Sequence, residues 1–354
     1  MAIYDIPVAK STLTRESLSQ RQGGIWRWSE ILPVRTPSFR MTLGEANAPV
    51  LQAFNLGKAL GLPALFIKDE SHGPLGSLEH RGLTVAVARA LELGVRDFTL
   101  AAYGSDGPAL AACAARSRSR AHIFMSKDAP VAEQVAVKTF GAQLILVDGL
   151  FSDAACMAAE VASSRGWLDI SAFREPYRCE GAKTIGLELA EAFAWELPDV
   201  IILPTGDGLE LLGLWKTFGE LEQLGLLGAK RPRLVAAQAS GCAPLARAFD
   251  EKSARASRWQ HVETVISALR IADVFADRLI LRAIRESMGT VVAVADQKIL
   301  AYQKELALCE GIFAAPQVGA GLAALQQLVR SGWINNDECV VIVNPASGLN
   351  YLSQ

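Results

Sequence analysis

The chain lacks long hydrophobic runs, closely spaced cysteines and an excess of one charge, and each absence excludes a class of protein. No stretch of about 18 apolar residues occurs in the 354 residues, so we expect no membrane-spanning helix. Residues 1–20 lack the basic start and apolar segment of a secretory signal, which favours a cytoplasmic location. The 35 basic and 37 acidic residues are intermixed, so neither a nucleic acid nor a membrane is an expected partner.

The cysteines and the overall composition indicate an ordinary globular protein. No two of the six cysteines have the spacing of metal ligands, so we expect reduced thiols and no metal site. Hydrophobic residues make up 51% of the chain, which is long enough for one large domain or two moderate ones.

Apolar runs alternate with segments of helical spacing along most of the chain. This alternation predicts βαβ units and therefore a parallel sheet. We expect strands at 64–67, 98–102, 121–125, 144–147, 200–203, 234–237, 290–294 and 340–343. We expect helices at 50–60, 80–93, 107–116, 129–140, 153–164, 209–220, 279–287, 298–309 and 322–329, and an irregular segment at 1–20.

The segment 64–83 combines a strand, a Gly/Pro-rich loop and the start of a helix. In open α/β sheets such loops follow the carboxyl ends of strands and hold ligands, because free N–H groups gather at the helix start. The loop contains Lys68-Asp69-Glu70 and then Pro74-Leu75-Gly76-Ser77-Leu78-Glu79-His80-Arg81-Gly82.

This segment resembles the active-site segment of threonine synthases and related fold-type II pyridoxal-phosphate (PLP) enzymes. Their segment reads approximately K-x-E-x-x-x-P-T-G-S-F-K-D-R-G, and its second lysine forms a Schiff base with the cofactor. That position holds Glu79 here. Further similar runs occur in order from about residue 22 to residue 350, including 24–34, 42–50 and 170–184.

The resemblance implies an α/β fold with two three-layer α/β/α domains, mostly parallel sheets and an interdomain cleft for a small-molecule ligand. The large domain would comprise residues 1–88 and 186–354, and the small domain residues 89–185. The resemblance also implies a homodimer. Residues such as Lys68, Glu70, Arg81 and Lys183 match the family, and we interpret them mainly as ion pairs that hold the fold.

Glu79 allows two interpretations. A carboxylate cannot form an imine, so Glu79 with His80 is a candidate general acid/base. Alternatively, Glu79 is a solvated or salt-bridged carboxylate that the helix dipole favours at a helix start.

Three further loops match the family's cofactor and substrate contacts with changed residues. In the run 103–107, Ser105 replaces the asparagine that contacts the pyridoxal ring oxygen, although the segment also reads as a capped strand–helix turn. In the run 206–210, Asp207 and Glu210 adjoin the place of the phosphate; like charges about 4 Å apart repel by roughly 4 kcal/mol at a dielectric of 20. In the run 344–349, Pro345 aligns with a threonine that faces the ring nitrogen, with Asn344 and Ser347 beside it.

These changes lead to an expectation of no covalent PLP and no cofactor, with bound PLP as the doubtful alternative. The expected function is a PLP-independent lyase or isomerase of a small polar metabolite. The alternatives are an inactive homologue that binds a metabolite or regulates a partner, and a PLP-dependent lyase that uses another lysine. Candidate catalytic residues are Glu79, His80 and Ser105. Candidate ligand-binding residues are Ser77, Arg81, Tyr103, Gly104, Asp106, Gly107, Gly206, Asp207, Gly208, Asn344 and Ser347.

Overall fold

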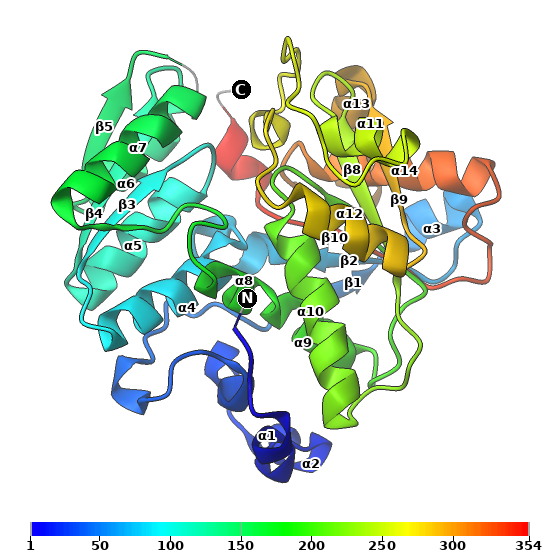
Figure 1. The fold of residues 1–354 in the computed structure, drawn as a ribbon. Helices are drawn as coiled ribbons and strands as arrows, with labels where there is room; N and C mark the ends of the chain where they lie inside the picture. Colours follow the sequence, from blue (N-terminus) through cyan, green and yellow to red (C-terminus); the bar gives the residue numbers. More distant parts are fainter. Residues whose placement is uncertain (1, 150, 353–354) are drawn as a thin grey trace.

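The computed structural model describes residues 2–149 and 151–352, which form two β-sheets with helices against both faces of each (Figure 1). The larger sheet has the strand order β1-β2-β10-β7-β8-β9 and the smaller one β5-β4-β3-β6. Strand pairs are parallel except β1 with β2, which confirms the expected mostly parallel sheets. The strands are β1 (Val50–Gln52), β2 (Leu65–Asp69), β3 (Asp97–Ala101), β4 (Arg120–Ser126), β5 (Gln143–Val147), β6 (Leu168–Asp169), β7 (Val200–Pro204), β8 (Arg233–Ala239), β9 (Thr290–Val294) and β10 (Val340–Asn344).

Each sheet lies between two layers of helices, which gives three layers in each lobe. Neighbouring residues of a strand face opposite sides, so Ile201 and Ile202 of β7 belong to different cores. In the smaller sheet, α7 packs on one face, and α5 and α6 pack on the other. The helices are α1 (Ile6–Thr12), α2 (Arg15–Gln20), α3 (Phe54–Leu60), α4 (Glu79–Glu92), α5 (Asp106–Ser117), α6 (Val131–Thr139), α7 (Phe151–Arg165), α8 (Tyr177–Ala182), α9 (Thr184–Ala192), α10 (Leu209–Leu224), α11 (Pro244–Asp250), α12 (Asp277–Glu286), α13 (Asp296–Glu310) and α14 (Val318–Arg330).

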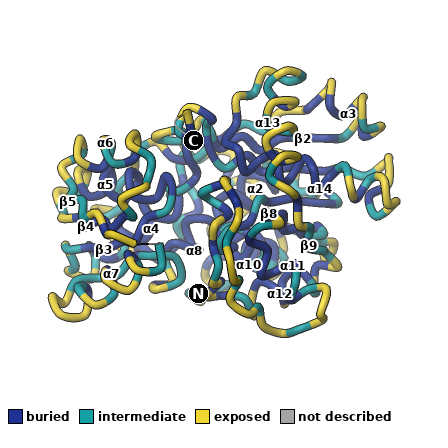
Figure 2. The backbone as a smooth tube through the Cα atoms, turned by 90° about the horizontal axis from the view of Figure 1, so that it is seen from above, coloured by how far each residue is buried: buried dark blue, intermediate teal, exposed yellow. Residues whose placement is uncertain are grey.

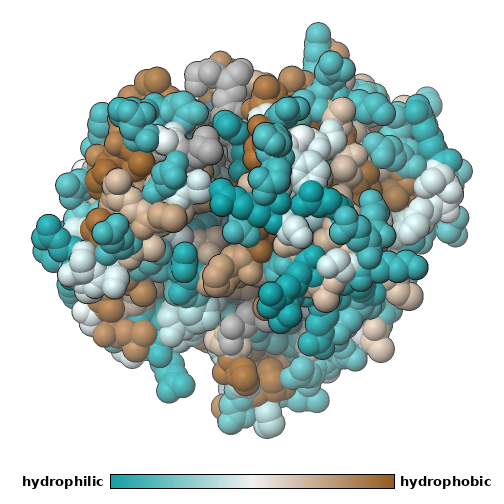
Figure 3. Space-filling view, turned by 45° about the horizontal axis from the view of Figure 1, so that its top comes forward, coloured by the Kyte–Doolittle hydropathy of each residue, from teal (hydrophilic) through white to brown (hydrophobic). Residues whose placement is uncertain are grey.

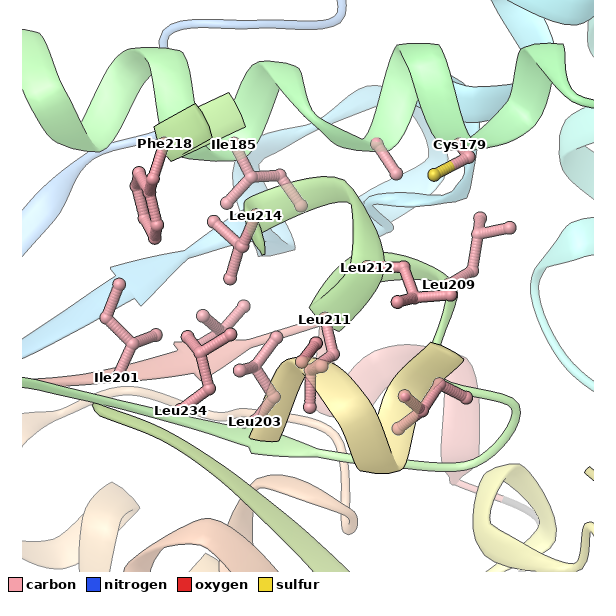
Figure 4. Packing of buried hydrophobic residues seen from close by; sticks show 14 of the residues in the cluster. Cys179, Ile185, Ile201, Leu203, Leu209, Leu211, Leu212, Leu214, Phe218 and Leu234 are labelled. Carbon is pink, nitrogen blue, oxygen red and sulfur yellow. The ribbon is translucent and has the colours of Figure 1, made fainter. Parts of the chain in front are cut away.

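Buried aliphatic side chains fill the space between the larger sheet and its helices. Figure 4 shows leucine side chains of α10 between β7 and β8 on one side and α9 on the other. In Figure 2 the buried backbone runs through the interior of both lobes, while exposed segments lie mainly at loops. Hydrophilic side chains cover most of the face in Figure 3, and hydrophobic ones form separate small groups. No helix in the described ranges is long and apolar enough to span a membrane.

Two expectations about local structure are wrong. The segment 1–20 is not irregular, because Asp5 caps α1 through the Val8 N–H at 3.1 Å and Thr14 forms a capping box with Ser17 at the start of α2. The segment 50–60 is not one helix. Residues 50–52 instead pair antiparallel with β2, and α3 begins only at residue 54.

Helices α4 and α8 cross at very short distance between the two sheets (Figure 1). A Cβ atom on Gly181 of α8 would lie 2.0 Å from the Arg81 carbonyl oxygen of α4. A Cβ atom on Gly82 would lie 3.0 Å from the Arg178 carbonyl oxygen. Glycines at the crossing therefore bring the first turn of α4 next to Arg178.

Candidate functional site

Two adjoining cavities, of about 40 and 70 Å³, lie where loops of both sheets meet. Their walls come from the start of α4 and from loops that follow the carboxyl ends of β3, β7 and β10, as expected for an open α/β sheet. Both cavities are lined by Leu78, Glu79, Tyr103, Ala268, Gln317 and Pro345. The first also contacts Ser77, Gly104, Ser105, Asp106, Ala346 and Tyr351, and the second contacts Leu203, Pro204, Gly206, Asp207, Glu210, Leu269 and Val343.

Glu79 begins α4 and forms an ion pair with Arg178 of α8. The Arg178 Nη2 atom donates to Glu79 Oε2 at 2.7 Å, and Arg178 Nη1 lies 3.9 Å from Asp106 Oδ2. Burial raises the pKa of Glu79 above its usual value. The positive charge of Arg178 opposes this rise in pKa, and the negative charge of Asp207 adds to it. Burial and then the charge of Glu79 raise the pKa of Asp106 well above its usual range. One guanidinium thus serves two carboxyl groups.

Tyr103 and Asp207 connect the loops of the two sheets. The Tyr103 hydroxyl donates to Asp207 Oδ2, and Asp207 Oδ1 accepts the Leu209 N–H at 2.9 Å. Asp207 therefore caps α10 with one oxygen, binds Tyr103 with the other, and lines the second cavity. Burial, with repulsion from Asp207, raises the pKa of Glu210 well above its usual range. The start of α10, where an anion would be favoured, already contains a carboxylate.

His80 and Arg81 lie outside the lining of both cavities. His80 is fully buried, neither of its ring nitrogens has a hydrogen-bond partner, and burial lowers its pKa to about 4. The imidazole is therefore neutral at neutral pH. The Arg81 guanidinium donates to Glu70 and to Glu188, each at 2.7 Å. Arg81, a candidate ligand-binding residue, thus belongs to a buried ion cluster and lines neither cavity.

The other candidate ligand-binding residues divide into two groups. Ser77, Gly104, Ser105 and Asp106 line the first cavity, and Gly206 and Asp207 line the second. Gly107, Gly208, Asn344 and Ser347 do not line either cavity.

Packing and hydrogen bonds explain the second group. A Cβ atom on Gly107 would lie 2.4 Å from Met125 Cε, so this glycine allows α5 to approach β4. Gly208 has a φ of +82° before the first residue of α10. Asn344 donates to Asp69 Oδ1 at 2.7 Å.

The sequence reasoning did not identify Arg178, Gln317 and Tyr351 as site residues. Gln317 Nε2 donates to the Tyr351 hydroxyl at 3.1 Å, and Gln317 Oε1 has no partner although the residue is only 5% exposed. Arg178 lies 99 residues from Glu79, so no local pattern marks it as the partner of that carboxyl group. No local pattern marks Gln317 or Tyr351.

Lysines near the matched motifs are held away from the cavities by ion pairs. Lys183 Nζ lies 2.9 Å from Glu180 Oε2, and Lys216 Nζ lies 2.9 Å from Glu220 Oε1. Lys68 Nζ lies 2.5 Å from Glu188 Oε2. None of these amines lines a cavity.

Comparisons with known proteins identify the relatives of the chain. Residues 41–346 match the family model described as pyridoxal-phosphate dependent enzyme. The chain is 34% identical to a threonine synthase of Methanocaldococcus jannaschii over 348 residues, which cover 98% of this chain and 85% of that protein. It is 33% identical to a threonine synthase of Methanosarcina acetivorans over 343 residues, covering 96% and 83%. Maize serine racemase has the same fold, with a TM-score of 0.73 and 21% identity over 86% of this chain and 88% of that structure.

The residues at the cavities do not fit PLP attached through an imine. Such attachment needs a lysine amine. No lysine is among the described residues that line the cavities, and Glu79 is the residue at the start of α4 that lines both. A phosphate bound at the start of α10 would adjoin Asp207 and Glu210, and Pro345 has no side-chain hydrogen-bonding group to offer a bound ring.

The family match corrects the expectation that the protein has no cofactor. The matching model describes pyridoxal-phosphate dependent enzymes, and the two relatives above are threonine synthases, so PLP is the cofactor that the family implies. The expected architecture agrees with the fold of the solved relatives. The chain therefore belongs to the family of pyridoxal-phosphate dependent enzymes and has their fold-type II architecture.

Proposed function

We propose that this chain is a threonine-synthase-like lyase or isomerase that acts on a small polar metabolite, with Glu79 as general acid/base and without an imine at position 79. The observation that carries the proposal is the position of the Glu79 carboxyl group. It lines both cavities, and its side chain remains 24% exposed. A small molecule in either cavity would therefore lie beside this carboxyl group.

The surroundings of Glu79 suit proton transfer. A general acid must hold a proton near neutral pH, and the raised pKa of Glu79 moves the carboxyl group in that direction. After Glu79 releases the proton, the Arg178 guanidinium at 2.7 Å stabilises the carboxylate. Positioned acids and bases of this kind contribute about 10²–10⁴-fold to a rate.

Ser105 and Tyr103 are suited to position the metabolite. Ser105 lines the first cavity at the start of α5, where its side chain interacts with the Tyr351 hydroxyl and would contact a bound ligand. The Tyr103–Asp207 hydrogen bond joins the loops that follow β3 and β7.

The proposal is tested by hydrogen exchange into small amino and hydroxy acids in ²H₂O, measured by NMR. We expect the wild-type protein to exchange a carbon-bound hydrogen of one of these compounds. We expect the Glu79→Gln variant to be slower by about 100-fold or more. The exposed Glu160 on α7 provides the matched control, Glu160→Gln, which should exchange at the wild-type rate. Equal rates in the wild type and Glu79→Gln would refute the role of Glu79.

A metabolite-binding protein without catalysis is the second candidate function. Its support is that the lining would also serve binding alone, because the cavities, of about 40 and 70 Å³, include the unpartnered Gln317 Oε1 atom. Binding without exchange of any compound would support this candidate over the first.

A further inference from the structure

The charges that line the two cavities indicate the class of ligand, if the proposed function of this site is correct. We infer that the site binds a small organic cation that carries one or more ammonium groups and no phosphate. The inference rests on the balance of charge, on one unpartnered acceptor atom and on the residues at the start of α10.

Carboxyl groups outnumber cationic groups at the cavities. Among the residues that the structure describes, the lining includes four acids and no lysine, arginine or histidine. Arg178 does not line either cavity, and its guanidinium lies 2.7 Å from Glu79 and 3.9 Å from Asp106. Asp207 and Glu210 have no cation within ion-pair distance among the described residues. An ammonium group would supply the missing positive charge.

Gln317 provides an independent indication of a hydrogen-bond donor in the ligand. The side chain lines both cavities, is 5% exposed, and has no partner for Oε1. Its amide nitrogen already donates to the Tyr351 hydroxyl at 3.1 Å, which fixes the direction of the unused oxygen. Buried acceptors are rarely left unpaired in native proteins, and an N–H group of a ligand would satisfy this one.

An anion is disfavoured at the place where helix geometry would otherwise attract it. The Leu209 N–H at the start of α10 is taken by Asp207 Oδ1 at 2.9 Å. A phosphate there would have to displace this carboxylate and lie beside Glu210. The start of α10 thus holds an internal anion, whose second oxygen accepts the Tyr103 hydroxyl.

The inferred ligand should bind more tightly as the pH rises. Without a cation, burial and mutual repulsion hold the pKa values of Glu79, Asp106 and Glu210 above their usual range. Arg178 opposes this shift, while Tyr103 contributes a neutral hydroxyl whose own pKa is raised well above normal. A bound ammonium group would favour the ionised carboxyl groups, so binding should release protons.

The test is isothermal titration calorimetry at pH 6 and pH 8 with methylammonium, 1,4-diaminobutane, the neutral butane-1,4-diol and inorganic phosphate. We expect an ammonium compound to bind, with about tenfold higher affinity at pH 8 than at pH 6. We expect neither the diol nor phosphate to compete with it. Titrations in buffers of different ionisation enthalpy should show release of protons.

Glu210→Gln and Glu160→Gln are the matched variants. Glu210→Gln should weaken ammonium binding by about tenfold and raise the thermal midpoint of the free protein, because it removes a buried carboxyl group that ionises more readily in the unfolded chain than in the folded one. A merely structural Glu210 would instead lower that midpoint. Glu160→Gln should bind like the wild type.

The inference is overturned if no ammonium compound binds, if the diol binds equally well, or if phosphate binds more tightly. The outcome is separable from that of the proposed function. Cation binding with exchange that does not depend on Glu79 would refute only the acid/base role. Exchange that depends on Glu79, without binding of either ammonium compound, would refute only the ligand class.

Discussion

Glu133 lies in the first turn of α6, and burial leaves its carboxyl group without a hydrogen-bond partner. The residue is 5% exposed, and neither carboxyl oxygen has a partner. Burial raises its pKa from 4.5 to about 7. Replacing Glu133 by glutamine keeps the shape and removes the charge, so the effect on stability can be calculated.

The sign follows from proton binding. Between pH 4.5 and about 7 the folded chain keeps the Glu133 proton while the unfolded chain loses it, so stability falls as the pH rises through this window. A shift of this size costs the wild type about 3 kcal/mol well above pH 7. Glu133→Gln should therefore gain about 2.5 kcal/mol relative to the wild type between pH 5 and pH 8.

Urea unfolding at pH 5, 6, 7 and 8, followed by circular dichroism, measures this gain. Glu160→Gln, an exposed replacement on α7, should show no such pH-dependent gain. A constant difference between Glu133→Gln and the wild type across this range would refute the assignment of a buried, unpaired carboxyl group.

Three further replacements test other parts of the site. The pKa of His80 is lowered to about 4 in the folded protein, so the wild type should lose about 3 kcal/mol of unfolding free energy as the pH falls from 6.5 to 4. His80→Phe should not show this loss, and urea unfolding at pH 7 and pH 4 measures it. Arg178→Met should cost about 3–5 kcal/mol in the same assay at pH 7, since Glu79 loses its partner; an unchanged midpoint would contradict the ion pair. Gly181→Ala should cost about 1–3 kcal/mol because its Cβ would meet the α4 backbone, whereas Gly228→Ala, with no atom within 4 Å of the added Cβ, should be tolerated.

Most strands could be predicted because they are continuous runs of buried apolar residues. The predicted strand at 290–294 coincides with β9, and the others differ from the observed strands by one or two residues at their ends. The two-residue β6 and the short helix α11 carry too few residues for a periodic pattern. The sheet assignment of residues 50–52 depends on pairing with β2, which no local pattern reveals.

A residue of the site could be predicted from the sequence only where it lies within one recognisable motif. Glu79 could be identified from its own segment, but its partner Arg178 is 99 residues away and meets it through the α4–α8 crossing. His80 follows Glu79 directly, yet successive residues of a helix point about 100° apart, so the imidazole lies in the core. The unpaired Gln317 oxygen likewise results from tertiary packing. The domain boundaries and the homodimer stay predictions.

Borohydride reduction of the protein as purified, followed by digestion and mass spectrometry, tests the central claim about position 79 most directly. If no lysine forms the imine, the protein should lack an absorbance at about 410 nm that borohydride removes. No lysine should carry a pyridoxyl group after reduction, even if PLP binds without a covalent bond. A stoichiometric pyridoxyl group on Lys68, Lys183, Lys216 or any other lysine would contradict the account.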